Sequence, residues 1–206
     1  MTATFEAVEK AIEGRIYTVA EYFELEKHSE IRYEYHYGKL IAMPEESKQA
    51  NRIAGNCEYA FRIHLKSKGY FTYRHDVRTI VKDGNIYRYP DLVVAPKSDS
   101  SDTHAVTKPE MLVEVTSVNS EKTDHESKMR EYLSLPTVQH YIIVSQKEML
   151  VEVYSRDKRG WHFDILTEPT DFIEIKLLDA QCTLSLSDIY EDVDFSILSD
   201  DIPSEA

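Results

Sequence analysis

Hydrophobic and polar positions in the first seventy residues predict a helix, a hairpin and a longer helix. Residues 18–28 open with the capping box Thr-Val-Ala-Glu, which predicts a short helix. Residues 32–43 alternate with a period of two on both sides of Gly38 and predict a β-hairpin that turns there. In residues 49–68 apolar side chains recur at helical spacing, and Gly69 follows where a helix end favours glycine.

The middle and C-terminal parts of the chain are typical of β-strands. Residues 70–74, 77–81 and 86–95 are β-like, and the last two segments are joined by Lys-Asp-Gly-Asn, a strong turn sequence. Residues 96–108 are polar and predict an irregular loop of the kind that often borders a site. Further strands are expected at residues 110–117, 138–144, 150–154, 161–166 and 172–177.

One helix interrupts this series of strands. The capping box Thr123-Asp-His-Glu126 starts it, and it is expected to end before Pro136. Strand, helix and strand in this order predict a βαβ crossover with parallel strands, whereas the flanking hairpins require antiparallel pairs. We therefore expect an α/β fold built on a mixed β-sheet flanked by helices.

The length and the cysteines indicate an ordinary single domain. At 206 residues the chain can bury a full core without disulfides or a structural metal. Neither Cys57 nor Cys182 lies in a CxxC or CxxH motif, so we expect both to be buried thiols in a reducing cytoplasm. The acidic N-terminus has no apolar signal region, and no apolar run approaches the length of a membrane span. We expect a soluble, cytoplasmic protein.

Charge is distributed unevenly along the chain. The net charge of -13 argues against generic nucleic-acid binding, because phosphate contacts are made by Lys and Arg. Residues 48–88, however, hold nine basic and three acidic residues. This segment is either a DNA-facing surface, with Arg52 and Arg88 as candidate contacts, or a set of helix and edge-strand charges that oppose aggregation. From Asp188 onward there are seven acids and no base, which predicts a solvated tail.

Two acidic residues occur in apolar segments, where packing gives no evident reason for a charged side chain. Glu114 lies between Val113 and Val115 in a strand that is apolar on both faces, and Asp91 opens an apolar run. An unpaired buried carboxylate is costly, so Glu114 should be protonated, ion-paired, at a solvated strand end or bound to a metal. If the two strands are neighbours, the two acids converge.

Lys128 lies on the helix that follows Glu114, beside an apolar stripe that includes Tyr132. Its stem can follow the sheet while its ammonium reaches toward Glu114. Two carboxylates that hold a divalent cation, together with one lysine, can hydrolyse a phosphodiester. The metal polarises the phosphate and lowers the pKa of a bound water, and the lysine stabilises the developing charge. Oxygen ligands favour Mg²⁺ or Mn²⁺ over zinc.

Each of these residues also has an ordinary structural interpretation. Asp91 fits a Pro-Asp turn, Glu114 an ion-paired acid at a strand end, and Lys128 a solvated helix lysine. The eight histidines show no spacing typical of metal ligands, so we expect surface or packing roles for them.

At these residues the sequence resembles the PD-(D/E)xK nuclease superfamily and, more closely, its bacterial family of "putative restriction endonucleases". The resemblance extends from Tyr17 to about Glu191. Its motifs, in chain order, are Tyr-Thr-Val-Ala-Glu-Tyr at Tyr17, Arg-Tyr-Glu at Arg32, Asn-Arg-Ile at Asn51, Tyr-Pro-Asp at Tyr89, Leu-Val-Glu-Val at Leu112, Asp124 followed by Lys128, and Val-Glu-Val-Tyr at Val151.

The resemblance implies a restriction-endonuclease-like core with a metal site. Asp91 and Glu114 would bind Mg²⁺ or Mn²⁺ with the backbone carbonyl of Val115. The superfamily lysine would fall at Thr116, so the family's amine is expected from the following helix, at Lys128. A further family acid, which lies at the edge of the site, corresponds to Glu34.

The resemblance also implies how the chain is divided and what it does. Residues 17–192 would form the nuclease domain, preceded by an extension, residues 1–16, and followed by an acidic tail, residues 193–206. The implied activity is that of a divalent-metal-dependent DNA endonuclease that acts as a homodimer, since both strands must be cut. The alternative is a catalytically silent member of the fold that binds nucleic acid or a protein partner.

Three positions depart from the family pattern. Relatives commonly read Asp-Gly-Glu where this chain reads Tyr37-Gly38-Lys39, and they commonly have histidine where it has Ala50. Any role of those family groups is therefore absent from this chain.

Overall fold

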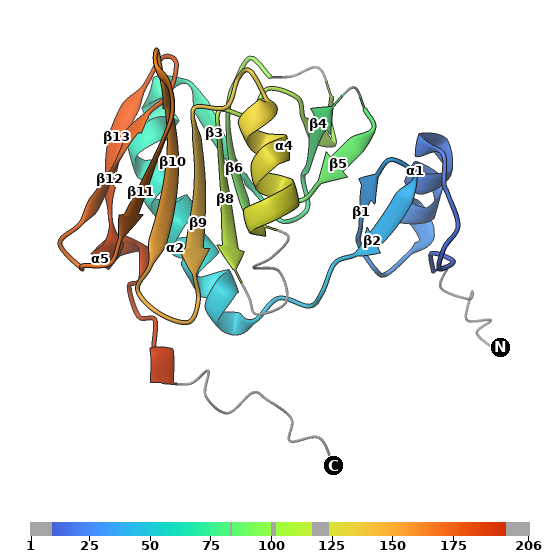
Figure 1. Ribbon diagram of the computed structural model, residues 1–206, viewed down its shortest axis with the longest axis horizontal. Helices are drawn as coiled ribbons and strands as arrows, with labels where there is room; N and C mark the ends of the chain where they lie inside the picture. Colours follow the sequence, from blue (N-terminus) through green and yellow to red (C-terminus); the bar gives the residue numbers. More distant parts are fainter. Residues whose placement is uncertain (1–9, 83, 100–101, 117–123, 197–206) are drawn as a thin grey trace.

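A six-stranded sheet forms the centre of the computed structural model, which describes residues 10–82, 84–99, 102–116 and 124–196 (Figure 1). Across the sheet the strands are β11 (Gly160–Leu166), β10 (Val151–Asp157), β9 (His140–Ser145), β8 (Met111–Thr116), β6 (Leu92–Pro96) and β3 (Tyr70–Arg74). Strands β8 and β9 are parallel, and the other neighbouring pairs are antiparallel. The expected crossover and mixed sheet are thereby confirmed.

Helices cover both faces of this sheet (Figure 1). On one face lie α2 (Lys48–Leu65), the 3₁₀ turn η1 (Lys66–Lys68), the hairpin of β12 (Phe172–Lys176) and β13 (Gln181–Ser185), and α5 (Leu186–Ile189). On the other face lies α4 (Met129–Ser134), preceded by a π-helical turn η2 (Asp124–Lys128). The helix expected after Glu114 is present, while Thr123 of its predicted capping box falls outside the described residues.

Alternation along β8 explains why the sheet is buried on both sides. Met111, Val113 and Val115 pack in the core cluster that includes α2, whereas Leu112 packs in the cluster that includes Tyr132 of α4. Because side chains alternate along a strand, Glu114 shares the α4 face with Leu112. The predicted two-sided burial of this strand is confirmed.

A second, five-stranded sheet lies beside the first. Its strands are β2 (Lys39–Ala42), β1 (Tyr33–His36), β5 (Ile86–Arg88), β4 (Arg78–Lys82) and β7 (Ala105–Val106). Helix α1 (Val19–His28) packs on it through an aromatic cluster that includes Tyr22, Tyr35 and Tyr87. The Thr18–Glu21 capping box and the β1–β2 hairpin at Gly38 match the predictions.

The structure corrects several sequence-based expectations. Residues 86–95 are two strands in different sheets, because Tyr89-Pro90-Asp91 interrupts the ladder where proline has no N–H to donate. The expected loop at 96–108 contains the short strand β7, and β13 and α5 were not predicted. These elements are short, so their formation depends on neighbours that are distant in sequence.

Ordered packing extends to both sides of the expected domain limits. The backbone N–H of Ile12 donates to the Tyr17 hydroxyl, and Ala11 packs against the α1 aromatic cluster. Val193 and Phe195 pack against the core cluster around α2. In the part of the chain that the structure describes, no helix is both long and apolar enough to cross a membrane.

Candidate active site

Asp91 and Glu114 face each other across neighbouring strands. Strand β6 pairs with β8 in the register Leu92 opposite Val113, so the residue before Leu92 and the residue after Val113 are also opposite. Opposed residues of an antiparallel pair project from the same face. Val93 and Leu112, two positions away from the acids, both pack on the α4 face. The two carboxylates therefore converge on that face, as expected.

A backbone amide holds Asp91 at the start of β6. The N–H of Val115 donates to Asp91 Oδ2 at 2.6 Å. In a strand the N–H and C=O of one residue point toward the same neighbouring strand. The carbonyl of Val115 is therefore directed to the same edge as the Asp91 carboxylate. Val115 is therefore next to Asp91, as a metal site formed by these groups would require.

Asp91 titrates at a higher pH than an ordinary aspartate. Burial raises the pKa of this carboxyl to about 6, against the lowering effects of Lys128, the Val115 N–H and His75. Its side chain keeps 21% exposure, so solvent reaches it. An acid that is costly to ionise in isolation, yet reachable from solvent, is one that a cation would stabilise as a carboxylate.

Glu114 is buried, and two groups of the following helix bind it. Lys128 Nζ lies 3.0 Å from Glu114 Oε2, and the Tyr132 hydroxyl donates to Glu114 Oε1 at 2.9 Å. Lys128 and Tyr132 lie one turn apart, so both point from the helix toward the same strand. The expected approach of the lysine to the acid is confirmed by this geometry. Thr116, at the superfamily's lysine position, instead donates its hydroxyl to the Val144 carbonyl.

A buried ion-pair network extends this site toward the second sheet. Arg88 binds Glu131 through two N–H groups at 2.8 Å each and donates to Glu34 at 2.6 Å. Glu34 Oε1 also lies 3.8 Å from Lys128 Nζ. Glu34 thus lies at the edge of the site and links Lys128 to Arg88.

The position of Arg88 does not fit the expected contact with nucleic acid. Arg88 is 1% exposed, and its guanidinium group is paired with the carboxylates of Glu34 and Glu131. Its burial follows from its strand: β1 pairs with β5 in the register Tyr35 opposite Tyr87, which places Glu34 opposite Arg88. The arginine therefore organises the interior of the protein.

The charges of this cluster fit a divalent cation. Among the described residues, four carboxylates face two cationic side chains: Glu34, Asp91, Glu114 and Glu131 against Arg88 and Lys128. With all four acids ionised the cluster has a surplus of negative charge in a poorly solvated place. Carboxylate oxygens are the donors that Mg²⁺ and Mn²⁺ prefer, so the donor set suits these ions.

Two further side chains lie beside Asp91 and were not predicted as site residues. His75, which follows β3, has Nδ1 at 3.9 Å from Asp91 Oδ1 and Nε2 at 3.6 Å from Glu46 Oε1. Glu46 lies just before α2. Nothing in the local sequence around these residues links them to Asp91, because the three come from separate elements.

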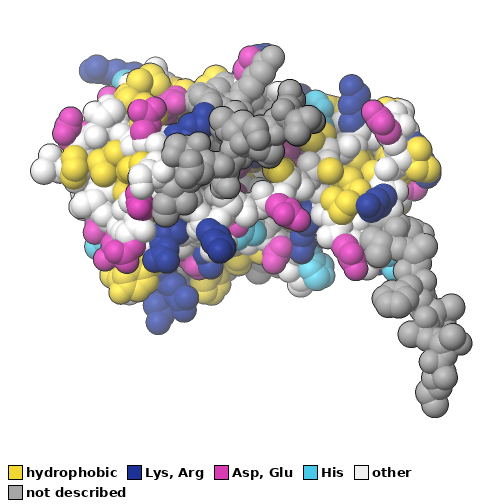
Figure 2. Space-filling view, turned by 90° about the horizontal axis from the view of Figure 1, so that it is seen from below, with side chains coloured by type: hydrophobic (Ala, Val, Ile, Leu, Met, Phe, Trp, Pro, Cys, Tyr) yellow, Lys and Arg dark blue, Asp and Glu magenta, His cyan; other side chains and the backbone are white. Residues whose placement is uncertain are grey.

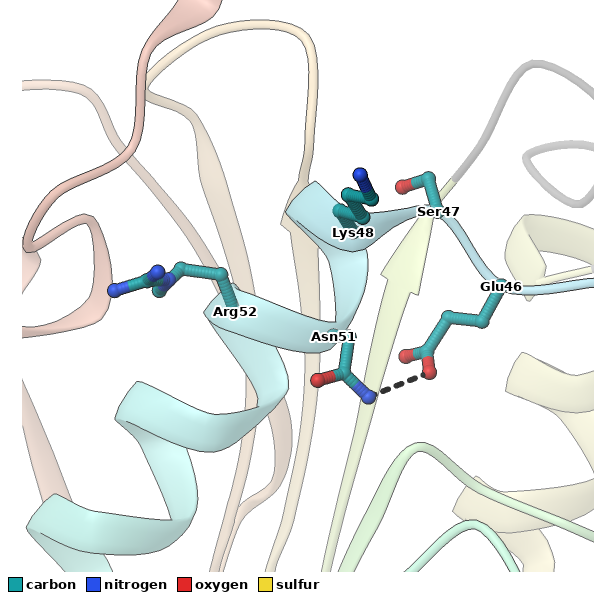
Figure 3. Close-up of a pocket in the computed structure, with 5 residues that line it drawn as sticks. All are labelled: Glu46, Ser47, Lys48, Asn51 and Arg52. Carbon is teal, nitrogen blue, oxygen red and sulfur yellow. Dashed lines mark hydrogen bonds between the residues drawn. The ribbon is translucent and has the colours of Figure 1, made fainter.

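A pocket of about 410 Å³ opens at the start of α2 (Figure 3). It is lined by Glu46, Ser47, Lys48, Asn51 and Arg52. Glu46 and Asn51 point toward each other and hydrogen bond at 2.9 Å, while Arg52 extends to the other side of the helix (Figure 3). Arg52 is exposed and lies 3.9 Å from Asp192. This arginine, unlike Arg88, is accessible to a ligand.

Acidic, basic and apolar side chains are interspersed on the face that Figure 2 shows. On this face the basic residues do not form one continuous patch. Of the three departures from the family pattern, Tyr37 and Lys39 are exposed at the β1–β2 hairpin, and Ala50 is buried in the core cluster of α2.

Comparisons with known proteins show which sequences and which fold this chain is similar to. Two uncharacterized proteins of Synechocystis are similar in sequence. One is 28% identical over 75% of this chain and 88% of its own length, and the other is 27% identical over 76% and 83%. A crystal structure described as a putative nuclease belonging to DUF820, from Anabaena variabilis, superposes with a TM-score of 0.67 at 18% identity, over 87% of this chain and 98% of that one.

The fold is therefore the restriction-endonuclease-like α/β fold that was expected. The sequence model of the Uma2 family, described as "Putative restriction endonuclease", matches residues 19–187, which is most of the chain. The protein belongs to this family of putative restriction endonucleases.

Proposed function

We propose that this protein is a divalent-metal-dependent endonuclease that hydrolyses phosphodiester bonds of DNA. The proposal is carried by one observation: Asp91 and Glu114 are opposed on one face of neighbouring strands, with the Lys128 ammonium 3.0 Å from Glu114. Membership of the family supports a nuclease activity. The metal dependence and the DNA substrate are inferred from the chemistry of these side chains.

Asp91, Glu114 and the carbonyl of Val115 would hold the Mg²⁺ or Mn²⁺ ion. When bound there, the ion supplies Lewis-acid polarisation of the phosphate and a bound water of lowered pKa. Val115 keeps Asp91 in place through its N–H, and Tyr132 keeps Glu114 in place through its hydroxyl. A carboxylate oxygen has a second lone pair, so these hydrogen bonds leave both acids able to bind a cation.

Lys128 has two roles in this proposal. Its ammonium pairs with Glu114 before a substrate arrives, and it stabilises negative charge that develops on the phosphate during hydrolysis. Glu34 Oε1 lies 3.8 Å from the same ammonium and provides it with a second carboxylate neighbour. Arg88 binds Glu34 and is itself bound by Glu131, so Arg88 and Glu131 act as positioning residues.

The remaining features of the proposal concern the environment of the reaction. Arg52 is the candidate contact with the DNA backbone, because it is exposed at the pocket beside Glu46. The nuclease domain is proposed to span residues 17–192. A homodimer is proposed because double-strand cleavage requires two sites, and a cytoplasmic location because its DNA substrate would be found there.

Cleavage of supercoiled plasmid and of single-stranded DNA tests the activity. Wild type is incubated with either DNA and with Mg²⁺, Mn²⁺ or chelator, next to Glu114→Gln, Asp91→Asn and the control Glu174→Gln. Glu174 is an exposed acid on β12, paired only with Lys176 among the described residues, so its replacement leaves the site unchanged. Metal-dependent cleavage by wild type and Glu174→Gln, but by neither site variant, is the expected result.

Two results would contradict the proposal. Equal cleavage by Glu114→Gln and wild type would show that a contaminant is responsible. Absence of cleavage together with absence of Mn²⁺ binding in calorimetry would identify the protein as a silent, nuclease-fold binding module.

A further inference from the structure

Three potential metal ligands from three separate elements meet on the side of Asp91 that faces away from Val115. Glu46 precedes α2, His75 follows β3 and Asp91 precedes β6. One ligating atom of each lies within 4.8 Å of the other two. The separations are close enough for a cation to draw the three together, because ligands of a transition metal lie about 2.0–2.2 Å from it.

His75 is placed between two carboxylates without a hydrogen bond to either. Its Nε2 is buried and has no hydrogen-bond partner in the described part of the chain. The separations of 3.6 Å to Glu46 and 3.9 Å to Asp91 exceed the length of an N–H···O hydrogen bond. Buried polar nitrogens are normally hydrogen-bonded, so an orphaned one beside two carboxylates indicates a ligand that completes the group.

Each carboxylate has one oxygen fixed by the protein and one that faces His75. Asp91 Oδ2 accepts the Val115 N–H, while Oδ1 faces the imidazole. Glu46 Oε2 accepts from Asn51, while Oε1 faces the imidazole. The side chains are thus oriented by groups outside the cluster, as is usual for the ligands of a metal site.

We propose that Glu46, His75 and Asp91 form a second cation site, which shares Asp91 with the Asp91–Glu114 site. This inference rests on the proposed function through that shared carboxylate. A donor set of one imidazole nitrogen and two carboxylate oxygens suits Mn²⁺, Co²⁺ or Zn²⁺. Mg²⁺ strongly prefers oxygen donors and is disfavoured here. The two sites therefore differ in the ions that they accept.

The shared acid gives the second site a role in the same reaction. Asp91 would bridge the two positions through its two oxygens, one on the side of Glu114 and one on the side of His75. Paired metal positions are used to hold the attacking and leaving oxygens of a phosphodiester together. Glu46 also lines the pocket at the start of α2.

The test is a measurement of Mn²⁺ binding by the full-length, chelator-treated protein. Calorimetry counts the ions bound, and pulsed electron paramagnetic resonance detects imidazole nitrogen coupled to Mn²⁺. Wild type should bind two ions per chain and show the nitrogen coupling. His75→Ala should bind one ion fewer and lose the coupling. Glu46→Gln, which keeps the histidine, should weaken the same site at least tenfold.

Two further variants separate the second site from the proposed nuclease site. Glu114→Gln should lose the other ion and keep the nitrogen coupling. His64→Ala, an exposed histidine on α2, is the matched control and should leave both ions in place. Circular dichroism and thermal unfolding establish that each variant is folded.

The second site is overturned if wild type shows no nitrogen coupling, or if the coupling persists in His75→Ala. Its failure is distinguishable from failure of the proposed function. Full cleavage and unchanged metal counts in Glu114→Gln would refute the nuclease site while the nitrogen coupling remained. Absence of the nitrogen coupling in wild type, with its Mg²⁺-dependent cleavage intact, would refute only the second site.

Discussion

Lys128 Nζ lies 3.0 Å from Oε2 of Glu114, and the two side chains are 11% and 3% exposed. A lysine on the same strand, two residues after the acid, would approach it from within the sheet. Here the strand position holds Thr116, and the amine comes from the helix that covers this face. The pair of acid and amine is therefore present, but the amine comes from the helix and not from the strand.

Replacing Lys128 should strongly destabilise the protein without metal. Lys128→Met leaves Glu114 buried with a missing cation, and breaking a buried pair in this way costs roughly 3–5 kcal/mol. Urea unfolding in the presence of chelator measures this loss, with the exposed Lys158→Met as control. Saturating Mn²⁺ should restore part of the stability, because it supplies positive charge next to Glu114. Cleavage should fall by about 100-fold or more.

Asp91 should make the metal-free protein less stable as pH rises. Its folded-state pKa is about 6, above the ordinary value of 3.8 for an aspartate. The folded state therefore holds a proton that the unfolded state has lost, and stability from this group declines as pH increases from about 4 to above 6. Asp91→Asn should be more stable than wild type at pH 7.5, by on the order of 2 kcal/mol, and equal to it near pH 4.

Urea midpoints of wild type and Asp91→Asn at these two pH values, with chelator present, measure this effect. A difference of the same size at both pH values would contradict the titration of Asp91 as its cause. In the same range, Mn²⁺ should bind wild type more weakly below pH 6, because the proton competes with the ion for the carboxylate.

Arg88 should matter for stability and not for long-range attraction of DNA. It is 1% exposed between Glu34 and Glu131, so Arg88→Met removes the nearest cationic partner of both carboxylates, of which Glu34 is buried. The expected loss is roughly 3–5 kcal/mol in urea unfolding. A variant that unfolds like wild type would show that the network contributes little.

Arg52 should behave in the opposite way. It is exposed at the α2 pocket, so Arg52→Ala should leave the urea midpoint nearly unchanged. If it contacts a phosphate, the slope of log binding constant against log salt should fall by about one. Fluorescence anisotropy of labelled DNA at several salt concentrations, with cleavage blocked by chelator, measures this slope. An unchanged slope would remove Arg52 from the DNA surface.

Tyr132 should contribute through one hydrogen bond. Tyr132→Phe keeps the aromatic contact with Tyr141 and removes the hydroxyl that donates to Glu114. An acceptor left buried without this donor costs about 1–3 kcal/mol. Thermal unfolding and Mn²⁺ calorimetry measure the loss of stability and the weaker binding. Tyr59→Phe, an exposed tyrosine on α2, is the control and should change neither.

Much of the secondary structure could be predicted because its causes are local. Thr18 and Glu21 cap α1 with their own side chains, and the alternation in β8 is a property of six consecutive residues. The position of Glu114 in an apolar strand likewise indicated a buried acid that required a partner. The residues that produce these signals lie close together in the sequence, so the signals can be recognised from the sequence alone.

The assignment of strands to sheets depended on long-range pairing. The break at Pro90 places β5 in the second sheet and β6 in the first, although the sequence predicted one β-like segment over residues 86–95. The roles of the charged residues depended on it as well. Strand register buries Arg88 opposite Glu34, whereas composition alone associated it with a basic surface.

The neighbours of Asp91 were the least predictable part of the site. Glu46 and His75 come from segments before α2 and after β3. The pairing of β3 with β6 brings His75 to Asp91, and the packing of α2 against the sheet brings Glu46 there. Local sequence encodes hydrogen-bond caps and the period of burial, because these depend on residues close in the chain. The folded arrangement decides which distant charged groups lie together in a poorly solvated place. In this protein it places Asp91 in both of the proposed metal sites.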